Sequence, residues 1–294
     1  MELVNSFLDY LRYERNCSEK TIMAYGEDIS QCEAFVVEKS GEFDIKTLDS
    51  DIIREWVISL MSNHYSSTSV NRKLSALRSL FHYLLRKGVV EADPLRKVVG
   101  PKNKEPLPVF LKEKEINELL DDTEFDDDFN GVRDHLIIEM FYLTGMRRSE
   151  LIGLRDIDVD FSAKLIKVTG KRNKQRLIPF AEELEMAMKN YLEKRNVVEN
   201  RMDDSFFVTE KGQPLHANQV YYIVKTNLSK VVTLKKRSPH VLRHTFATTM
   251  LNHDAKLSSV KELLGHSSLA TTQIYTHTTF EELKEAYKQA HPRA

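Results

Sequence analysis

The side chains best suited to chemistry are concentrated between Ser238 and His277, where histidines, an arginine and a tyrosine recur at short intervals. Ser238 followed by Pro239 is typical of a helix start, with serine as N-cap and proline in the first helical position. His240 and Arg243 are three residues apart, so both side chains leave the same face of that first turn. Unpaired N–H groups and the positive end of the helix dipole favour an anion there. This stretch therefore predicts an anion-binding pocket.

The second half of the same stretch adds a histidine and a tyrosine. Ser259 to Glu262 fits a capping box that opens a short helix, and Gly265 suits the position just after that helix. His266 is then held directly beyond a helix end. Tyr275 follows on a segment, SLATTQIY, that can form two turns of helix. We expect both side chains to reach the pocket of His240 and Arg243.

A further arginine is presented upstream from a bend. Thr144-Gly145 ends a very apolar predicted helix, and Arg147 follows immediately before the next helix, RSELIGL. A buried arginine needs an anionic partner, and Glu150 is the only obvious acid nearby. Two interpretations are possible. Arg147 and Glu150 form a structural ion pair, or Arg147 clamps a phosphate while Glu150 helps to orient it.

Together these residue types suit the cleavage of a phosphodiester. Arg147 and Arg243 are planar donors that match non-bridging phosphate oxygens, and His266 can add a hydrogen bond. Tyr275 is either a packing residue, the default for any one of eleven tyrosines, or the nucleophile of such a reaction. Its reference pKa of about 10 means that attack needs a base or a strongly positive site. His240 is the natural acid–base partner by its own pKa.

Three segments, PHVLRHTFAT, LLGHSSLATTQIYTH and TGMRRSELIGL, resemble in order and spacing the signature boxes of the tyrosine recombinases, the phage integrase and Xer family. The resemblance covers nearly the whole chain. It implies a site-specific recombinase that cuts and rejoins DNA through a 3′-phosphotyrosyl intermediate and a Holliday junction, with no metal, ATP or other cofactor. Dimer resolution, mobile-element integration and inversion all remain open. The box T-G-x-R-x-S-E favours the phosphate-clamping interpretation of Arg147 and Glu150, and the place of Tyr275 in its box favours the nucleophile.

The resemblance also gives a role to a lysine that would otherwise be read as ordinary surface. Lys171 lies at the predicted tip of a hairpin, in GKRNKQR. This segment resembles the family hairpin whose lysine enters the minor groove as the catalytic acid. Arg172 departs from the pattern, because related Xer proteins often have glycine at this place.

The elements that must hold these residues are mainly helical. Four one-sided apolar patterns fill the first ninety residues, as a small helical bundle requires. Alternating apolar residues from Ile157 to Phe180 predict a small three-stranded antiparallel sheet. We therefore expect a mainly α protein with a small antiparallel sheet. Its parts are an N-terminal four-helix core-binding (SAM-like) DNA-binding domain over 1–98, a proline-rich linker over 99–108, and an α-rich catalytic domain over 109–294.

Net charge is only −1, yet basic residues gather in the part that carries the candidate site. Asp and Glu are missing from Lys211 to His253 and from Ala163 to Ile178, whereas 121–128 holds six acids and no base. Such basic runs suit a phosphate backbone, although either run alone would also fit solvated surface. The predicted DNA contacts are Arg72, Lys73, Arg78, Arg172, Lys174, Arg176, Lys235, Lys236 and Arg237.

Composition and cysteine content predict a cytoplasmic protein. Hydrophobic content of 41% and charged content of 30% are typical of a soluble globular protein, and no apolar run is long enough for a membrane span. The first residues do not resemble a signal peptide. Cys17 and Cys32 have no metal-type spacing.

The C-terminal segment FEELKEAYKQA places Phe280, Leu283 and Tyr287 on one side of a helix. Such a stripe could pack on its own domain. The resemblance implies instead that it docks into a neighbouring protomer, in a homo- or hetero-tetramer on double-stranded DNA.

Three other functions fit parts of this sequence. His240 and His244 have the spacing of a zinc metalloprotease pair, but Val241 stands where H-E-x-x-H requires glutamate. A DNA-binding regulator with a dead site would be expected to lack the nucleophile or an arginine. A type IB topoisomerase would use the same chemistry within one duplex, without an exchangeable C-terminal helix.

Overall fold

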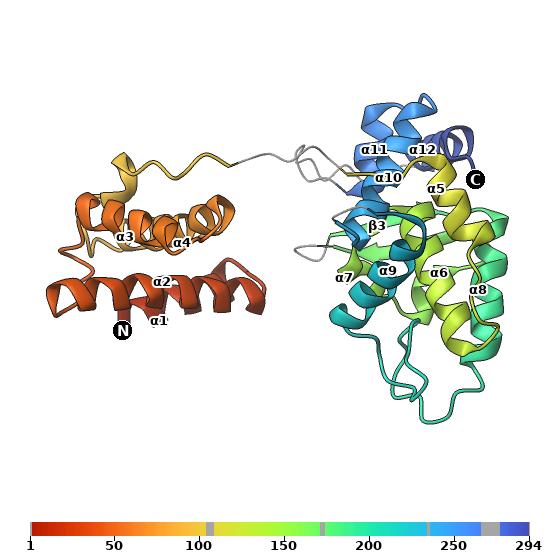
Figure 1. Ribbon diagram of the computed structural model, residues 1–294, viewed down its shortest axis with the longest axis horizontal. Helices are drawn as coiled ribbons and strands as arrows, with labels where there is room; N and C mark the ends of the chain where they lie inside the picture. The colour runs from red at the N-terminus through yellow and green to blue at the C-terminus, as the bar shows by residue number, and fades with distance from the viewer. Residues whose placement is uncertain (1, 104–108, 171–173, 234–235, 266–276, 294) are drawn as a thin grey trace. The chain divides into compact units, whose positions relative to one another are not determined.

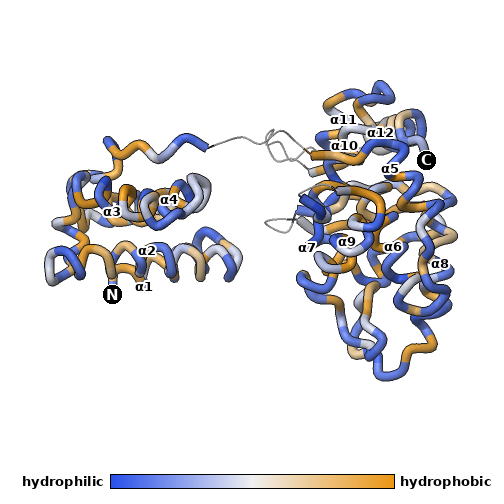
Figure 2. Tube along the Cα trace, in the orientation of Figure 1, coloured by the Kyte–Doolittle hydropathy of each residue, from blue (hydrophilic) through white to orange (hydrophobic). Residues whose placement is uncertain are grey.

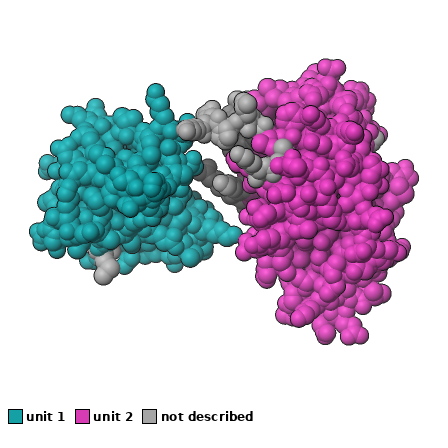
Figure 3. All heavy atoms as spheres, viewed as in Figure 1, with its two compact units in different colours: residues 1–106 teal, residues 107–294 magenta. Residues whose placement is uncertain are grey.

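The structure, a computed structural model, describes residues 2–103, 109–170, 174–233, 236–265 and 277–293, with only the backbone described over 277–282. It divides into two compact units, Met1–Pro106 and Leu107–Ala294 (Figure 3). The predicted fold class, mainly α with a small antiparallel sheet, is confirmed. No described helix combines the length and apolarity that crossing a bilayer would demand.

Unit 1 is a bundle whose main helices match the four predicted apolar patterns. Its helices carry both hydrophobic and hydrophilic residues along their length (Figure 2), as one-sided burial requires. Trp56, Phe7 and Phe81 are fully buried in its core. The described elements are α1 (Glu2–Asp9), a π-helical turn (Tyr10–Glu14), α2 (Glu19–Ser40), α3 (Ser50–Ser62), α4 (Ser67–Arg86) and a 3₁₀ turn (Pro94–Lys97).

Side chains of α4 hold the chain that leaves unit 1. Arg78 donates to the carbonyl of Val98 at 2.9 Å, and Asn71 donates to that of Pro101 at 2.8 Å. The first residues of the predicted linker are therefore fixed against the bundle. Asn71 also donates to the Asn103 side chain at 3.0 Å.

Unit 2 is built around α6, which packs against α8 and α10 (Figure 1). Ten residues of α6 are buried, and seven of them are apolar or aromatic. The described helices of unit 2 are α5 (Glu113–Asn117), continued by a π-helical turn (Glu118–Asp122), α6 (Phe129–Thr144), α7 (Arg148–Ile152), a 3₁₀ turn (Asp156–Asp158), α8 (Glu182–Arg195), α9 (Ala217–Val231), α10 (Pro239–Asn252), α11 (Leu257–Leu264) and α12 (His277–Ala290).

The antiparallel sheet has the order β1-β2-β3. Its strands are β1 (Val159–Asp160), β2 (Leu165–Thr169) and β3 (Gln175–Pro179). In the β2–β3 hairpin Ile166 faces Ile178 and Val168 faces Arg176. The prediction that Ile157 belongs to the first strand is wrong, because it lies in the 3₁₀ turn and is 74% exposed.

One boundary in the region of the candidate site also differs from the prediction. α11 begins at Leu257 with Lys256 as its cap, so the proposed capping box of Ser259 and Glu262 falls inside the helix. Its end agrees with the prediction, since Gly265 is left-handed with φ of 64°. Apolar residues of this short helix, such as Val260 and Leu263, pack against α10 and α12.

Candidate active site

A sharp bend after α6 presents the first arginine. Gly145 ends α6 in a left-handed conformation with φ of 59°, and a Cβ there would meet Phe246 Cδ1 at 2.5 Å. Arg147 is the N-cap of α7, and its backbone N–H donates to Glu150 Oε2 at 2.7 Å. The helix end at Gly145 agrees with the prediction, and the structure adds that glycine is needed there for close packing as well as for the turn.

α10 supplies the second arginine. Ser238 precedes the helix and Pro239 occupies its first position, as predicted. Arg243 is buried and donates through Nη1 to the carbonyl of Gly145. Burial, followed by the positive charges of Arg147 and Arg176, lowers the pKa of Arg243 to about 10, so it stays protonated at neutral pH. The α6–α7 bend and the first turn of α10 are therefore joined at one point.

The end of α11 binds three arginines through three consecutive carbonyls. Arg176 Nε donates to Leu263 O at 2.7 Å. Arg243 Nη2 donates to Leu264 O at 2.7 Å, and Arg147 Nη2 donates to Gly265 O at 3.0 Å. The last carbonyls of a helix have no partner within the helix, and here side chains from three other elements supply one. This arrangement places positive charge at the negative end of the α11 dipole.

Glu150 connects two of these arginines. Its side chain is 0% exposed and accepts from Arg147 Nη1 and Arg176 Nη1, each at 2.7 Å from Oε1. Burial alone would raise the pKa of Glu150, but the hydrogen bonds and charge of Arg176, and then the bonds from Arg147, lower it to about 2. The structural ion pair considered from the sequence is therefore present. The side chain of Arg147 nevertheless remains 33% exposed, so the pair does not bury it.

His240 lies one turn before Arg243 at an exposed position of α10. Partial desolvation, then the positive charges of Arg243, Arg148 and Arg147, lowers its pKa. The imidazole is therefore neutral at pH 7 and able to accept a proton. Among the described residues no third histidine, cysteine or acid joins His240 and His244 in a metal-binding group.

Lys171, His266 and Tyr275 lie outside the described residues, but two residues that adjoin them lie at the arginine cluster. A Cβ on Gly170 would lie 3.4 Å from Glu150 Oε1 and 3.9 Å from Arg147 Nη1. Gly265 accepts from Arg147. The chain positions directly before Lys171 and His266 therefore meet beside Arg147.

The predicted DNA contacts fall into two groups. Lys73 is buried and donates to Asp28 at 2.8 Å, and Arg176 is buried against Glu150. Neither location matches the surface contact that the sequence indicated. Arg72, Lys174 and Lys236 are exposed, whereas Arg78 and Arg237 are half-buried. Arg172 and Lys235 lie outside the described residues.

Sequence reasoning missed that Arg176 is a partner of Glu150. A signal for its inward direction was present. Side chains two residues apart on a strand share a face, and Ile178, which is plainly apolar, is 0% exposed. An arginine on the buried face of a strand needs an acid, and the buried carboxylate that Arg176 meets is Glu150.

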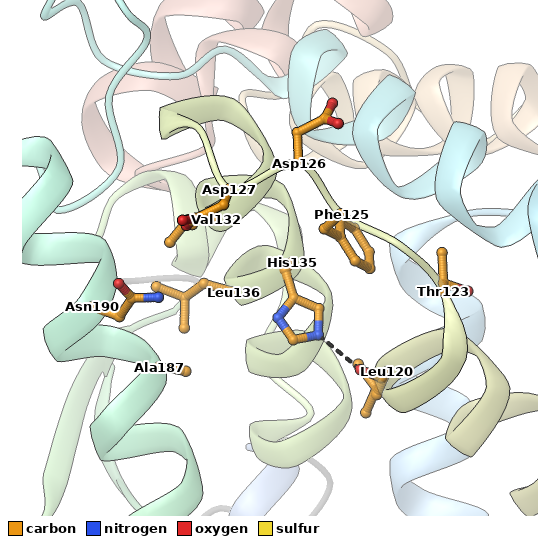
Figure 4. Close-up of a pocket in the computed structure, with 10 residues that line it drawn as sticks. All are labelled: Leu120, Thr123, Phe125, Asp126, Asp127, Val132, His135, Leu136, Ala187 and Asn190. Atoms are coloured by element: carbon orange, nitrogen blue, oxygen red, sulfur yellow. Dashed lines mark hydrogen bonds between the residues drawn. The ribbon is translucent and has the colours of Figure 1, made fainter.

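Unit 2 also contains a hollow of about 260 Å³ that shares no lining residue with the arginine cluster (Figure 4). His135 points into it and contacts the Leu120 carbonyl at 3.1 Å, and its ring lies 4.6 Å from that of Phe125. Desolvation lowers the pKa of His135. The remaining lining carries no constellation that would cleave or transfer a group.

Comparison with known proteins matches both units. Residues 109–282 match the phage integrase family, and residues 4–88 match its N-terminal SAM-like domain. A tyrosine recombinase XerC of Chlorobaculum tepidum is 37% identical over 99% of this chain and 94% of its own length. The tyrosine recombinase XerC of Listeria innocua is 39% identical over 100% of this chain and 98% of its own length. A crystal structure of XerH site-specific recombinase bound to a palindromic difH substrate, a post-cleavage complex, is similar with a TM-score of 0.73 and 25% identity, over 96% of this chain and 83% of that one.

Proposed function

Because the chain belongs to the phage integrase family and is a tyrosine-type site-specific DNA recombinase, we propose that it cuts and rejoins DNA through a covalent bond to Tyr275. The observation that carries this assignment is the meeting of Arg147 and Arg243 at the end of α11. Two guanidinium groups from different elements are thereby held beside Gly265, the residue before His266. Strand exchange would then proceed through a Holliday junction.

In the proposed step the Tyr275 oxygen attacks the scissile phosphorus, and the bond to the 5′ oxygen breaks. His240 accepts the phenol proton, which its neutral state permits. Lys171 gives a proton to the departing oxygen. The products are a 3′-phosphotyrosyl bond and a free 5′-hydroxyl. Because the ester energy is retained, a hydroxyl of another strand can reverse the step without ATP or a metal.

Arg147 and Arg243 neutralise the phosphate in this scheme. A guanidinium has five N–H donors, and each of these arginines uses only some of them on protein acceptors. Donors fixed before the substrate arrives need no reorganisation as charge develops in the transition state. Glu150 supports the pair by orienting Arg147.

We propose that the predicted basic residues other than the buried Lys73 and Arg176 form the DNA-binding surface. Lys174 and Lys236 are exposed and can reach phosphates by their own flexibility. Arg72 is exposed as well, but its Nη1 pairs with the buried Asp28, so it offers a phosphate only its remaining donors. Arg78, Arg237, Arg172 and Lys235 stay in the proposal as sequence predictions. A double-stranded DNA substrate and two free cysteines favour action in the cytoplasm.

We further propose that α12 exchanges between protomers in a tetramer on DNA. In the structure its Leu283, Tyr287 and Ala290 are buried against α10 and α11 of the same chain. A face that accepts α12 from its own chain can accept an identical helix from a neighbour. The Phe280 side chain lies outside the described residues. Truncation at Thr279 should abolish synapse assembly on paired sites, and normal assembly would refute the exchange.

The catalytic assignment is tested with nicked suicide duplexes in the absence of magnesium. The parent protein should form an SDS-resistant adduct that carries a free 5′-hydroxyl, whereas Tyr275→Phe should form none. Tyr222→Phe is a matched control, because Tyr222 is 61% exposed on α9. An adduct that persists in Tyr275→Phe would reassign the nucleophile.

A further inference from the structure

Arg176 lies on the inward face of β3, and its side chain is only 7% exposed. A buried guanidinium is costly unless its donors are satisfied. Nε donates to Leu263 O at 2.7 Å, Nη1 to Glu150 Oε1 at 2.7 Å and Nη2 to Glu150 Oε2 at 3.0 Å. All three nitrogens therefore have protein partners, which a residue reserved for DNA would not need.

Glu150 is the link from Arg176 to the phosphate-binding arginine. Each carboxylate oxygen accepts one bond from Arg176 and one from Arg147, the latter through Nη1 at Oε1 and through the backbone N–H at Oε2. Rotation of this carboxylate would break bonds to both arginines at once. The bidentate pair with Arg176 therefore fixes the plane in which Glu150 presents its oxygens to Arg147.

Arg176 also holds the end of α11 directly. Its bond to Leu263 O is the first of three adjacent carbonyl bonds, followed by those of Arg243 and Arg147. A Cβ on Gly265 would lie 3.1 Å from Arg176 Cδ, so the chain that leads to His266 passes against this side chain. β3, α7 and α11 are thus connected through one residue.

We propose that Arg176 is a positioning residue for strand cleavage, acting through Glu150 on Arg147 and through Leu263 on the end of α11. This inference rests on the proposed function. It assigns Arg176 to the rate of the chemical step and not to DNA affinity. Its loss leaves Glu150 with one ion-pair partner and α11 with one fewer anchor, so Arg147 and Arg243 no longer meet the phosphate in fixed geometry. A misplacement of about 1 Å can cost about 100-fold in rate.

The test separates binding from chemistry on the nicked suicide duplex. For Arg176→Met we expect DNA affinity and its salt dependence close to those of the parent, and adduct formation at saturating DNA slower by about 10- to 100-fold. Arg176→Lys keeps the charge but cannot reach both partners, so it should recover part of the rate. It also serves as the test variant if Arg176→Met fails to fold.

Arg195→Met is the matched control for the loss of a buried structural arginine. The Arg195 side chain is 4% exposed and pairs with Asp156 at 2.6 Å, away from the arginine cluster. This variant should melt at a lower temperature, yet its folded fraction should form adduct at the parental rate. Equal rate losses for Arg195→Met and Arg176→Met would overturn the proposal, because both effects would then be general destabilisation.

A double-variant cycle shows whether Arg176 acts through Arg147. The combination of Arg147→Met and Arg176→Met should be little slower than Arg147→Met alone. Fully multiplicative effects, or an Arg176→Met defect confined to DNA affinity, would contradict the inference. If Tyr275→Phe still forms adduct, the assignment of Tyr275 as nucleophile in the proposed function fails. A parental rate for Arg176→Met, with Tyr275→Phe inactive, overturns this inference alone.

Discussion

Arg147 and Arg243 donate to two adjacent carbonyls, those of Gly265 at 3.0 Å and Leu264 at 2.7 Å. Two arginines from distant parts of the chain are therefore held side by side by one helix end. Because this end leads directly to His266, any change that shifts it should slow strand cleavage.

Gly265→Ala should slow adduct formation more than its backbone strain alone explains. Gly265 has φ of +64°, and an added Cβ would lie 3.1 Å from Arg176 Cδ and 3.2 Å from its Nη1. Gly88→Ala is the control, since Gly88 has φ of +67° with nothing within 4 Å of its Cβ position. Both variants should lose about 1–2 kcal/mol of stability in thermal unfolding. Only Gly265→Ala should lower the adduct rate, and equal rates would contradict this.

Glu150 should contribute to acid stability in a defined direction. Its folded-state pKa of about 2 is below the unfolded value of about 4.3, so its contribution is present above pH 4.3 and is lost as pH falls toward 2. Glu150→Gln should be less stable than the parent at pH 7 and should show a weaker dependence on pH below 4. Urea unfolding across this range measures both, and parallel curves would refute the prediction.

Glu139 should make the protein less stable as pH rises, which is opposite to the effect of Glu150. Burial, then the negative charges of Glu183 and Asp121 against the positive Arg293, raises the pKa of Glu139 to about 8, and its Oε2 has no hydrogen-bond partner among the residues that the structure describes. The folded state therefore holds the proton more tightly, and stability falls as pH rises from about 4.3 to about 8. Glu139→Gln should remove that decline and raise the unfolding temperature at pH 8. A decline that persists in the variant would assign it elsewhere.

Two substitutions of Tyr287 should distinguish the contribution of its ring to the packing of α12 from that of its hydroxyl. Tyr287 is 1% exposed, and no described residue gives its buried hydroxyl a hydrogen bond. Tyr287→Phe should be neutral or stabilising because it removes an unpaired hydroxyl. Tyr287→Ala should cost about 3–5 kcal/mol through the cavity that it leaves. Denaturant titration of unit 2 checks both, and a destabilised Tyr287→Phe would indicate a hidden partner for the hydroxyl.

Lys236 should act on DNA affinity alone. It is exposed, and no described acid forms an ion pair with it. Lys236→Ala should weaken DNA binding for all sequences and reduce the slope of log affinity against log salt by about 1, with the adduct rate at saturating DNA unchanged. Lys189→Ala is the control, because Lys189 already pairs with Glu185. An unchanged salt slope for Lys236→Ala would remove this residue from the DNA surface.

The sequence alone determined several local features of this protein, because glycine stops, a serine–proline start and a hairpin depend on nearby residues. Gly145 and Gly265 stop helices where the pattern indicated, and Ser238-Pro239 starts one. The β2–β3 hairpin follows from short-range alternation in the same way. The motifs also identified the family, since their order and spacing are properties of the chain itself.

Only the tertiary structure decided which distant groups become partners. Arg176 reaches Leu263 across 87 positions, and Lys73 reaches Asp28 across 45. Arg176 and Lys73 each lie in a basic segment of the sequence, and a basic segment is also what a DNA-binding surface would show. Whether an arginine or lysine faces solvent or a buried acid depends on how separate elements pack. The free energy of that packing comes from contacts between residues far apart in the sequence, which a local pattern does not show. For the same reason α11 begins at Leu257, where packing against α10 and α12 favours helix, and not at the serine that could have capped it.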